Sequence, residues 1–273
     1  MQWRIGDITI RVQANWNSCS PLRMDRYQPF RLPDESVLPD ILIDAEMTAN
    51  WTDEIDQFEV HFARRDAVPD GAAIDVRSLG GIGQFQVLES ARMHGRFRLD
   101  GASEAPLDRL LRLSLALYFG QFNTGALLHS SGVASDDGVW LFAGPSGVGK
   151  STIARELRGG RSFFTEDISV LRFDDTRGLI AWSTPFGKGD VMRVQPAVER
   201  VAGILFLEQG TAARREHLPL GEFARRLYCE TRYFDRDAGT ADGFLDFFER
   251  LYQTGLCEKL TFAPNASFWD VLE

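Results

Sequence analysis

The sequence predicts an α/β protein, with a small β-rich domain at residues 1–103 followed by a larger domain of strands and helices at residues 104–273. Three observations support this fold class. The first hundred residues alternate apolar and polar side chains in short runs separated by turn residues, as half-buried strands do. From about residue 106 leucines recur at helical spacing. A dense apolar run at 139–143 then leads through a glycine-rich loop into a second helical segment.

The first domain is expected to consist of short strands. The alternating segments are DITIRVQ, DILIDAE and FEVHFARR, which begin at residues 7, 40 and 58. Residues 85–101 indicate a pair of strands ending at Gly101, and PDG at 69–71 is typical of a turn. These segments carry no obvious catalytic pattern, so we expect this domain to bind a substrate or a partner.

The second domain is expected to alternate strands and helices. Its first helix covers LDRLLRLSLALYFGQF at 107–122, and a second helix follows the glycine-rich loop and ends at Gly159-Gly160. A short final helix is expected to begin at Asn265 or Ser267. Strands are expected within 163–173, 178–184, 201–210 and 257–264, and further helices near 219–234 and 241–254.

Composition and charge exclude several classes of function. The chain has a net charge of −9 and lacks a run of five or more basic residues, so we expect no nucleic-acid partner. Its three cysteines are widely spaced, which argues against a disulfide framework or a zinc site. No segment has the length of apolar sequence that a membrane span needs, and the first residues do not resemble a signal peptide. We therefore expect a cytoplasmic protein with no membrane partner.

The segment GPSGVGKST, at residues 144–152, matches the pattern of a phosphate-binding loop. Its glycines allow successive backbone N–H groups to turn toward an anion, and the helix that follows adds the positive end of its dipole. Lys150 would reach the β- and γ-phosphates of ATP, and the Ser151 hydroxyl would bind Mg²⁺. The residues predicted to bind the nucleotide are Gly144, Pro145, Ser146, Gly147, Val148, Gly149, Lys150, Ser151 and Thr152.

The sequence offers two acidic candidates for the group that acts on the terminal phosphate. Glu166 and Asp167 are adjacent within an apolar segment, where one carboxylate could face a metal and the other point away, or both could turn inward where a strand ends. An exposed turn with two acids is the alternative. Glu208 ends the apolar run GILFLEQ and would suit a hydrolytic enzyme, but Leu207 stands where such enzymes usually have an aspartate.

The segment from LALYFGQFNTGALLHSSGV through VWLFAGPSGVGKSTIARELRGGRSFFTEDISVL resembles the catalytic domain of HPr kinase/phosphorylase and, more closely, the divergent HPr-kinase-related proteins. The shared features are a histidine fifteen positions before the first loop glycine, the loop, and an acidic pair after a short helix. The resemblance covers residues 107–190 best. It implies a P-loop kinase domain with the fold of HPr kinase and PEP carboxykinase.

The resemblance also implies roles for individual residues. Asp167 would be the catalytic base that takes the proton of an acceptor serine, with Lys150 on the phosphates. His129 would be a third catalytic residue beside them, although a core-facing strand histidine is the alternative. Ser151, Glu166 and Asp167 would be the metal ligands, and Glu166 departs from the aspartate usual in the family. Lys188, in STPFGKGD, would meet a phosphate.

The implied activity is an ATP- and Mg²⁺-dependent kinase whose partner is a peptide or protein bearing an acceptor serine. The N-terminal region does not resemble that of authentic HPr kinases, so HPr is not the expected substrate. Some related proteins with a β-rich front domain phosphorylate a serine of a lasso-peptide precursor, which suggests a natural-product precursor peptide. Three alternatives remain: a small-molecule kinase, a P-loop ATPase that uses Glu208, and a non-catalytic nucleotide-binding module. The sequence leaves open whether the chain forms a homo-oligomer.

Overall fold

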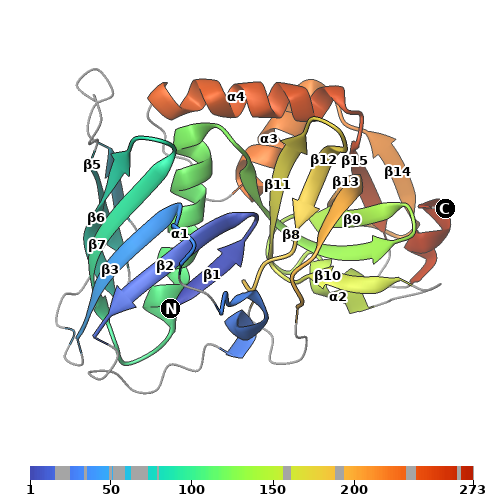
Figure 1. Cartoon of the computed structure of the whole chain (residues 1–273). Helices are drawn as coiled ribbons and strands as arrows, with labels where there is room; N and C mark the ends of the chain where they lie inside the picture. Colours follow the sequence, from blue (N-terminus) through green and yellow to red (C-terminus); the bar gives the residue numbers. More distant parts are fainter. Residues whose placement is uncertain are drawn as a thin grey trace. The chain divides into compact units, whose positions relative to one another are not determined.

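The structure, a computed structural model, is a mixed α/β protein (Figure 1). It forms two compact units, Met1–Phe122 with Asp235–Ala241 and Asn123–Phe234 with Asp242–Glu273. The residues described are 1–15, 25–33, 36–48, 51, 59–62, 73–78, 80–155, 161–187, 194–231, 238–262 and 266–272.

The first unit contains a seven-stranded sheet in its described part, with the order β1-β2-β3-β7-β6-β5-β4. The parallel pairings are β2 with β3 and β3 with β7, and the other neighbours are antiparallel. The expected pair of strands within 85–101 corresponds to β6 and β7. In chain order the strands are β1 (Gln2–Ile5), β2 (Ile8–Ala14), β3 (Ile41–Thr48), β4 (Glu59–Phe62), β5 (Ala73–Ser78), β6 (Gly81–Leu88) and β7 (Arg92–Asp100).

Helix α1 (Ala105–Phe122) belongs to this first unit, because it packs on β6 and β7. The two units therefore meet in sequence at 122/123, after the helix, whereas the sequence placed a boundary at 103/104, before it. The change of hydrophobic period at residue 106 marks where a helix begins. It does not reveal which sheet that helix covers.

A buried carboxylate connects α1 to the 3-10 helix η2 (Asp25–Phe30). Asp108 accepts hydrogen bonds from the Tyr27 hydroxyl at 2.5 Å, from Arg26 Nη2 at 2.7 Å and from Arg112 Nε at 2.8 Å. Burial, and then the negative charge of Asp108, raise the pKa of Tyr27 well above its ordinary value of 10.0. Two guanidinium groups and a phenol thus compensate one carboxylate that is largely withdrawn from water.

Five strands of the second unit pair in a closed circuit, because β9 pairs with both β8 and β13. The circuit runs β8–β11–β12–β13–β9 and returns to β8. Strand β13 extends beyond it to pair with β15, which pairs with β14, and β8 also pairs with β10. The strands are β8 (Ala126–Ser135), β9 (Gly138–Ala143), β10 (Ser162–Thr165), β11 (Ile168–Asp174), β12 (Gly178–Trp182), β13 (Val198–Gln209), β14 (Arg214–His217) and β15 (Cys257–Phe262).

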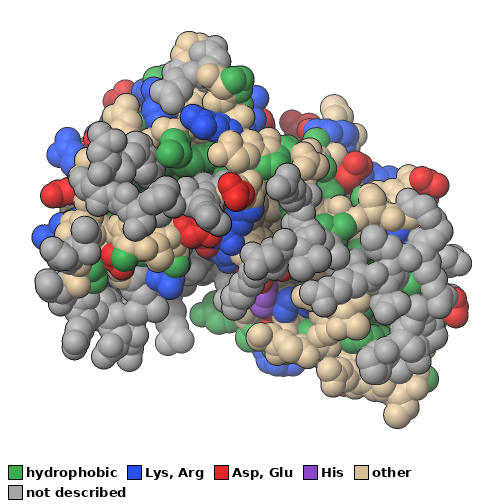
Figure 2. Space-filling model, turned by 90° about the horizontal axis from the view of Figure 1, so that it is seen from below, with side chains coloured by type: hydrophobic (Ala, Val, Ile, Leu, Met, Phe, Trp, Pro, Cys, Tyr) green, Lys and Arg blue, Asp and Glu red, His purple; other side chains and the backbone are tan. Residues whose placement is uncertain are grey.

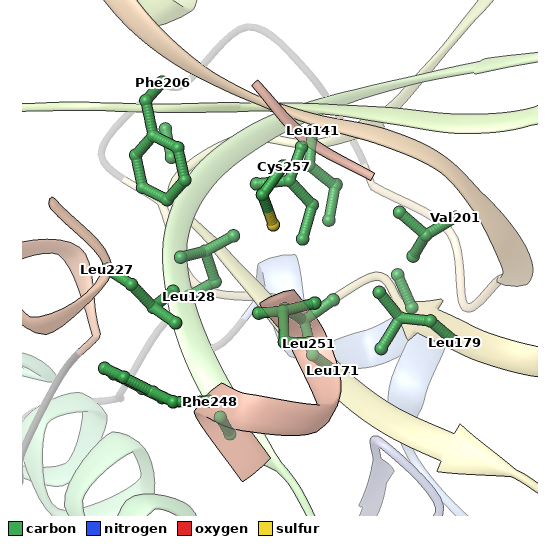
Figure 3. Close-up of a cluster of buried hydrophobic side chains, with 14 of the residues drawn as sticks. Leu128, Leu141, Leu171, Leu179, Val201, Phe206, Leu227, Phe248, Leu251 and Cys257 are labelled. Carbon is green, nitrogen blue, oxygen red and sulfur yellow. The ribbon is translucent and has the colours of Figure 1, made fainter. Parts of the chain in front are cut away.

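The main core of the second unit lies between these strands and helices α3 (Leu220–Glu230) and α4 (Ala238–Gln253) (Figure 3). Strand residues such as Leu128, Leu141 and Phe206 contribute to the same cluster as Leu227 of α3 and Leu251 of α4. The helices supply one apolar stripe each, so their burial depends on the sheet.

A second apolar cluster lies under the short helix α2 (Lys150–Arg155). Ile153 of α2 packs in it with Phe142 of β9 and Phe262 of β15. The 3-10 helix η4 (Ala266–Val271) adds Phe268 and Trp269, whose rings contact Phe142 edge-on. This cluster fixes α2 against the strand that precedes the glycine-rich loop.

Three features of the second domain differ from what the sequence predicts. The apolar segment at 163–173 forms two strands, β10 and β11, that are separated at Glu166-Asp167. The final helix is a 3-10 helix, and β14 was not expected at all. The predicted helix end at Gly159-Gly160 lies outside the described residues.

Helices of the described residues include none that is both long and apolar enough to span a lipid bilayer. On the face drawn in Figure 2, acidic and basic side chains are intermingled.

The Tyr27–Asp108 contact predicts a loss of stability in alkali. Because the folded state raises the pKa of Tyr27, it keeps a proton that the unfolded state loses, so the free energy of unfolding should fall as the pH rises above 10.0. Tyr27→Phe should remove this part of the pH dependence. It should also cost about 1–3 kcal/mol at neutral pH, since it deletes a hydrogen bond to a charged group.

Denaturant unfolding of both proteins from neutral to alkaline pH measures these effects. An equal loss of stability above pH 10 in wild type and Tyr27→Phe would contradict the assignment.

Candidate functional site

The glycine-rich loop joins the end of β9 to the start of α2, as the sequence predicts. Gly147 and Gly149 have φ angles of 82° and 119°, which side-chain-bearing residues rarely adopt. A Cβ at Gly149 would also lie 2.6 Å from Cζ of Phe262. The loop conformation therefore requires glycine at residue 149 for two separate reasons.

Lys150 directs its ammonium group into this loop. Its Nζ donates to the carbonyl oxygens of Gly144 at 2.5 Å and Pro145 at 3.1 Å, and the residue is only 8% exposed. A phosphate oxygen bound in the loop would compete with these two carbonyls for the ammonium group. The Ser131 hydroxyl of β8 donates to the Lys150 carbonyl at 2.9 Å, which fixes the start of α2 against β8.

Glu166 and Asp167 lie where β10 ends and β11 begins, so the pair sits at the end of a strand. The hydroxyls of Thr165 and Thr184 both donate to the carbonyl of Ile168, at 2.8 and 2.6 Å. Both threonines are fully buried, so these bonds fix the turn that carries the two carboxylates. The Ser130 amide of β8 donates to the Asp167 carbonyl at 3.1 Å.

The Glu166 carboxylate lies against the backbone of Gly187. A Cβ at Gly187 would be 2.1 Å from Oε2 of Glu166, so a larger residue there would displace the carboxylate. The loop after β12 therefore approaches Glu166 at Gly187. Lys188, the neighbouring candidate, lies outside the described residues.

His129 of β8 lies between two carboxylates. Its Nδ1 is 2.9 Å from Oε2 of Glu230, and its Nε2 is 3.2 Å from Oδ1 of Asp167. The side chains of His129 and Glu230 are 9% and 8% exposed, and that of Asp167 is 20% exposed. The histidine thus contacts the acidic pair directly, as the resemblance implied, and it also contacts a third acid.

Glu230 was missed by sequence reasoning. It is the last residue of α3 and is buried with Phe223 and Leu227, at the spacing of one apolar helical stripe. A carboxylate at such a position must have a partner inside the protein. The break in the apolar stripe was the one local signal that could have identified it.

A cavity of about 610 Å³ adjoins the glycine-rich loop. One wall is the loop at 144–148, and another is the end of β13 at 206–209. The third wall comes from α3. It consists of Arg225, Arg226, Cys229 and Glu230.

Glu208, the alternative acidic candidate, lines this same cavity. Strand β13 runs parallel to β9 and pairs with it, so the two strands end side by side at the loop. The Glu208 carboxylate is half-exposed and pairs with Arg226 Nη2 at 2.9 Å. Arg226 also pairs with Glu222 one turn earlier, at 2.7 Å.

Ser151, Glu166 and Asp167 are the residues predicted to hold Mg²⁺. Among the described residues, no three His, Cys, Asp or Glu side chains are grouped to hold a metal ion. Mg²⁺ in nucleotide enzymes is typically held by one or two carboxylates together with substrate phosphates. The exposed Ser151 hydroxyl and the carboxylates of Glu166 and Asp167 are oxygen ligands of the kind it prefers.

Neither a scan against protein-family models nor a search of curated protein sequences finds a match to this chain.

Gly149→Ala should damage the loop itself. The positive φ alone should cost on the order of 1–3 kcal/mol, and the new methyl group would overlap Phe262. We expect a lower melting temperature and at least tenfold weaker ATP binding by calorimetry, since about 1.4 kcal/mol corresponds to tenfold.

Gly221→Ala is the matched control, because nothing lies within 4 Å of a Cβ at that position in α3. ATP affinity and stability in Gly149→Ala equal to those of the control would refute the role assigned to the loop.

Proposed function

We propose that this chain is a kinase that transfers the γ-phosphate of Mg-ATP to a hydroxyl group, that of a serine in a peptide or protein. One observation carries the proposal. Adjacent residues of β8 contact both halves of the site. Ser131 donates to the backbone carbonyl of Lys150, Ser130 donates to the backbone carbonyl of Asp167, and His129 contacts the Asp167 carboxylate. The phosphate-binding lysine and the candidate base are therefore neighbours across one short stretch of strand.

In this mechanism the chain supplies charge and position. Lys150 and the backbone amides of the loop would neutralise negative charge on the phosphoryl group as it moves. Asp167 would accept the proton of the attacking hydroxyl, and the bonds from Thr165 and Thr184 would keep its turn in place. Mg²⁺, held by Ser151 with Glu166 and Asp167, would supply further neutralisation of the phosphate charge.

The resemblance to HPr-kinase-related proteins favours a serine acceptor. We propose with it that the second unit has the fold of HPr kinase and PEP carboxykinase. A precursor peptide of a natural product is the specific acceptor that the β-rich first unit suggests by analogy. A kinase that acts on a small-molecule hydroxyl would use the same residues, and only the identity of the acceptor distinguishes it from a peptide kinase.

A P-loop ATPase is the second candidate, and the position of Glu208 supports it. Glu208 ends the strand parallel to β9 and lines the cavity beside the loop, as expected of a residue that activates water. Its pairing with Arg226 opposes that role, because the ion pair engages the carboxylate and restrains its rotation.

Asp167→Asn and Glu208→Gln distinguish the two candidates. With γ-labelled ATP, Mg²⁺ and serine-containing peptides, wild type should transfer label to a hydroxyl. Asp167→Asn should reduce that transfer by about 10²–10⁴-fold, the usual contribution of a general base. Glu208→Gln should retain most of it.

Free phosphate released without any acceptor, insensitive to Asp167→Asn and abolished by Glu208→Gln, would replace the kinase with an ATPase. ATP binding without turnover under any acceptor would indicate a nucleotide-binding module.

A further inference from the structure

We propose that Glu230 is a positioning residue of this site, which holds His129 by Nδ1 so that Nε2 meets Asp167. The inference rests on the proposed function, because it takes Asp167 as the base. It adds a residue of α3 to the site. This helix lies outside residues 107–190, which the sequence resemblance covers best.

Three side chains from three separate elements form the arrangement. Glu230 ends α3, His129 lies in β8, and Asp167 lies in the turn between β10 and β11. The contacts are 2.9 Å from Glu230 to Nδ1 and 3.2 Å from Nε2 to Asp167. Each ring nitrogen therefore faces a different carboxylate.

The chemistry of imidazole makes this arrangement directional. A carboxylate at Nδ1 requires an N–H at that nitrogen, which defines the orientation of the ring and leaves Nε2 for the second partner. An orienting carboxylate behind a histidine performs the same task in hydrolytic triads.

Because Glu230 is buried, its carboxylate depends on the contact with His129. At 8% exposure a carboxylate loses most of its hydration, so it must be bonded inside the protein. The backbone around it is also fixed, since Thr231 forms an isolated bridge with Leu128, next to His129. The end of α3 thus contacts β8 through both backbone and side chain.

The consequence concerns Asp167. Its Oδ1 meets Nε2, so the orientation of the histidine ring constrains the rotation of the candidate base. Without Glu230 the ring could turn about its Cβ–Cγ bond, and the carboxylate would lose one fixed contact. Misplacing a reacting group by about 1 Å can cost about 100-fold in rate.

Two substitutions test this in the full-length protein. Glu230→Leu removes the acceptor but preserves bulk and helix propensity, whereas Glu230→Gln keeps an oxygen that can accept Nδ1–H. Steady-state phosphotransfer should show kcat reduced about 10–100-fold in Glu230→Leu, with the KM for ATP nearly unchanged. Glu230→Gln should recover most of that loss.

Glu249→Leu is the matched control, because Glu249 is an exposed glutamate of α4 that accepts a hydrogen bond from Gln253, one turn along its own helix. Its kcat should equal that of wild type. Equal kcat in Glu230→Leu and wild type, or an equal rise of KM in both Glu230 variants, would overturn the inference.

A second measurement needs no turnover. In protein labelled with ¹⁵N-histidine, one of four histidines, identified by its loss in His129→Gln, should show a protected Nδ1–H signal. The signal should persist in Glu230→Gln and Glu249→Leu and disappear in Glu230→Leu.

An unchanged Nδ1–H signal in Glu230→Leu would overturn the role of Glu230 even if the kinase were active. If no phosphotransfer occurs with any acceptor but the signal behaves as expected, the kinase proposal fails and the hold of Glu230 on His129 stands.

Discussion

The site depends on a short polar run inside a buried strand. His129, Ser130 and Ser131 follow each other in the interior of β8, and all three are buried. Buried polar groups are costly unless they are hydrogen-bonded, so each side chain must have a partner from another element. Those partners are Glu230, Ser169 and the carbonyl of Lys150. The need to satisfy three adjacent residues therefore draws α3, β11 and α2 to one position on β8.

The closed strand circuit explains why two acids, Asp167 and Glu208, are both candidates for the group that acts on the terminal phosphate. Strand β9, which carries the loop, lies between β8 and β13. Asp167 reaches the site from the β8 side and Glu208 from the β13 side. A flat sheet with β9 at its edge would offer an acid from one neighbour only. The topology thus accounts for both candidate mechanisms without distinguishing them.

Local features were predictable from the sequence, and features created by tertiary pairing were not. The loop, its flanking strand and helix and the paired strands ahead of Gly101 follow from spacing and glycine content alone. The separation of β10 from β11 could not be predicted in this way. It depends on hydrogen bonds to the Ile168 carbonyl from the hydroxyls of Thr165 and the distant Thr184. The importance of Glu230 likewise could not be read from its neighbours, because its partner His129 is 101 residues away in the chain.

Helix α3 contacts Glu208 directly and is connected to Asp167 through His129, and the environments of these two contacts differ. Arg226 pairs with a half-exposed Glu208, and pairs of this kind contribute about 0–1 kcal/mol. Glu230, four residues later, contacts His129 where both side chains are less than a tenth exposed. Removing one member of a buried, charged contact costs more, because the other member is left without hydration. The position of α3 is therefore set at its Glu230 end, by the same histidine that meets Asp167, while the Arg226 contact can break at little cost. A kinase of the kind proposed would use such a buried contact beside its base, because the rate of phosphoryl transfer comes from positioning and charge.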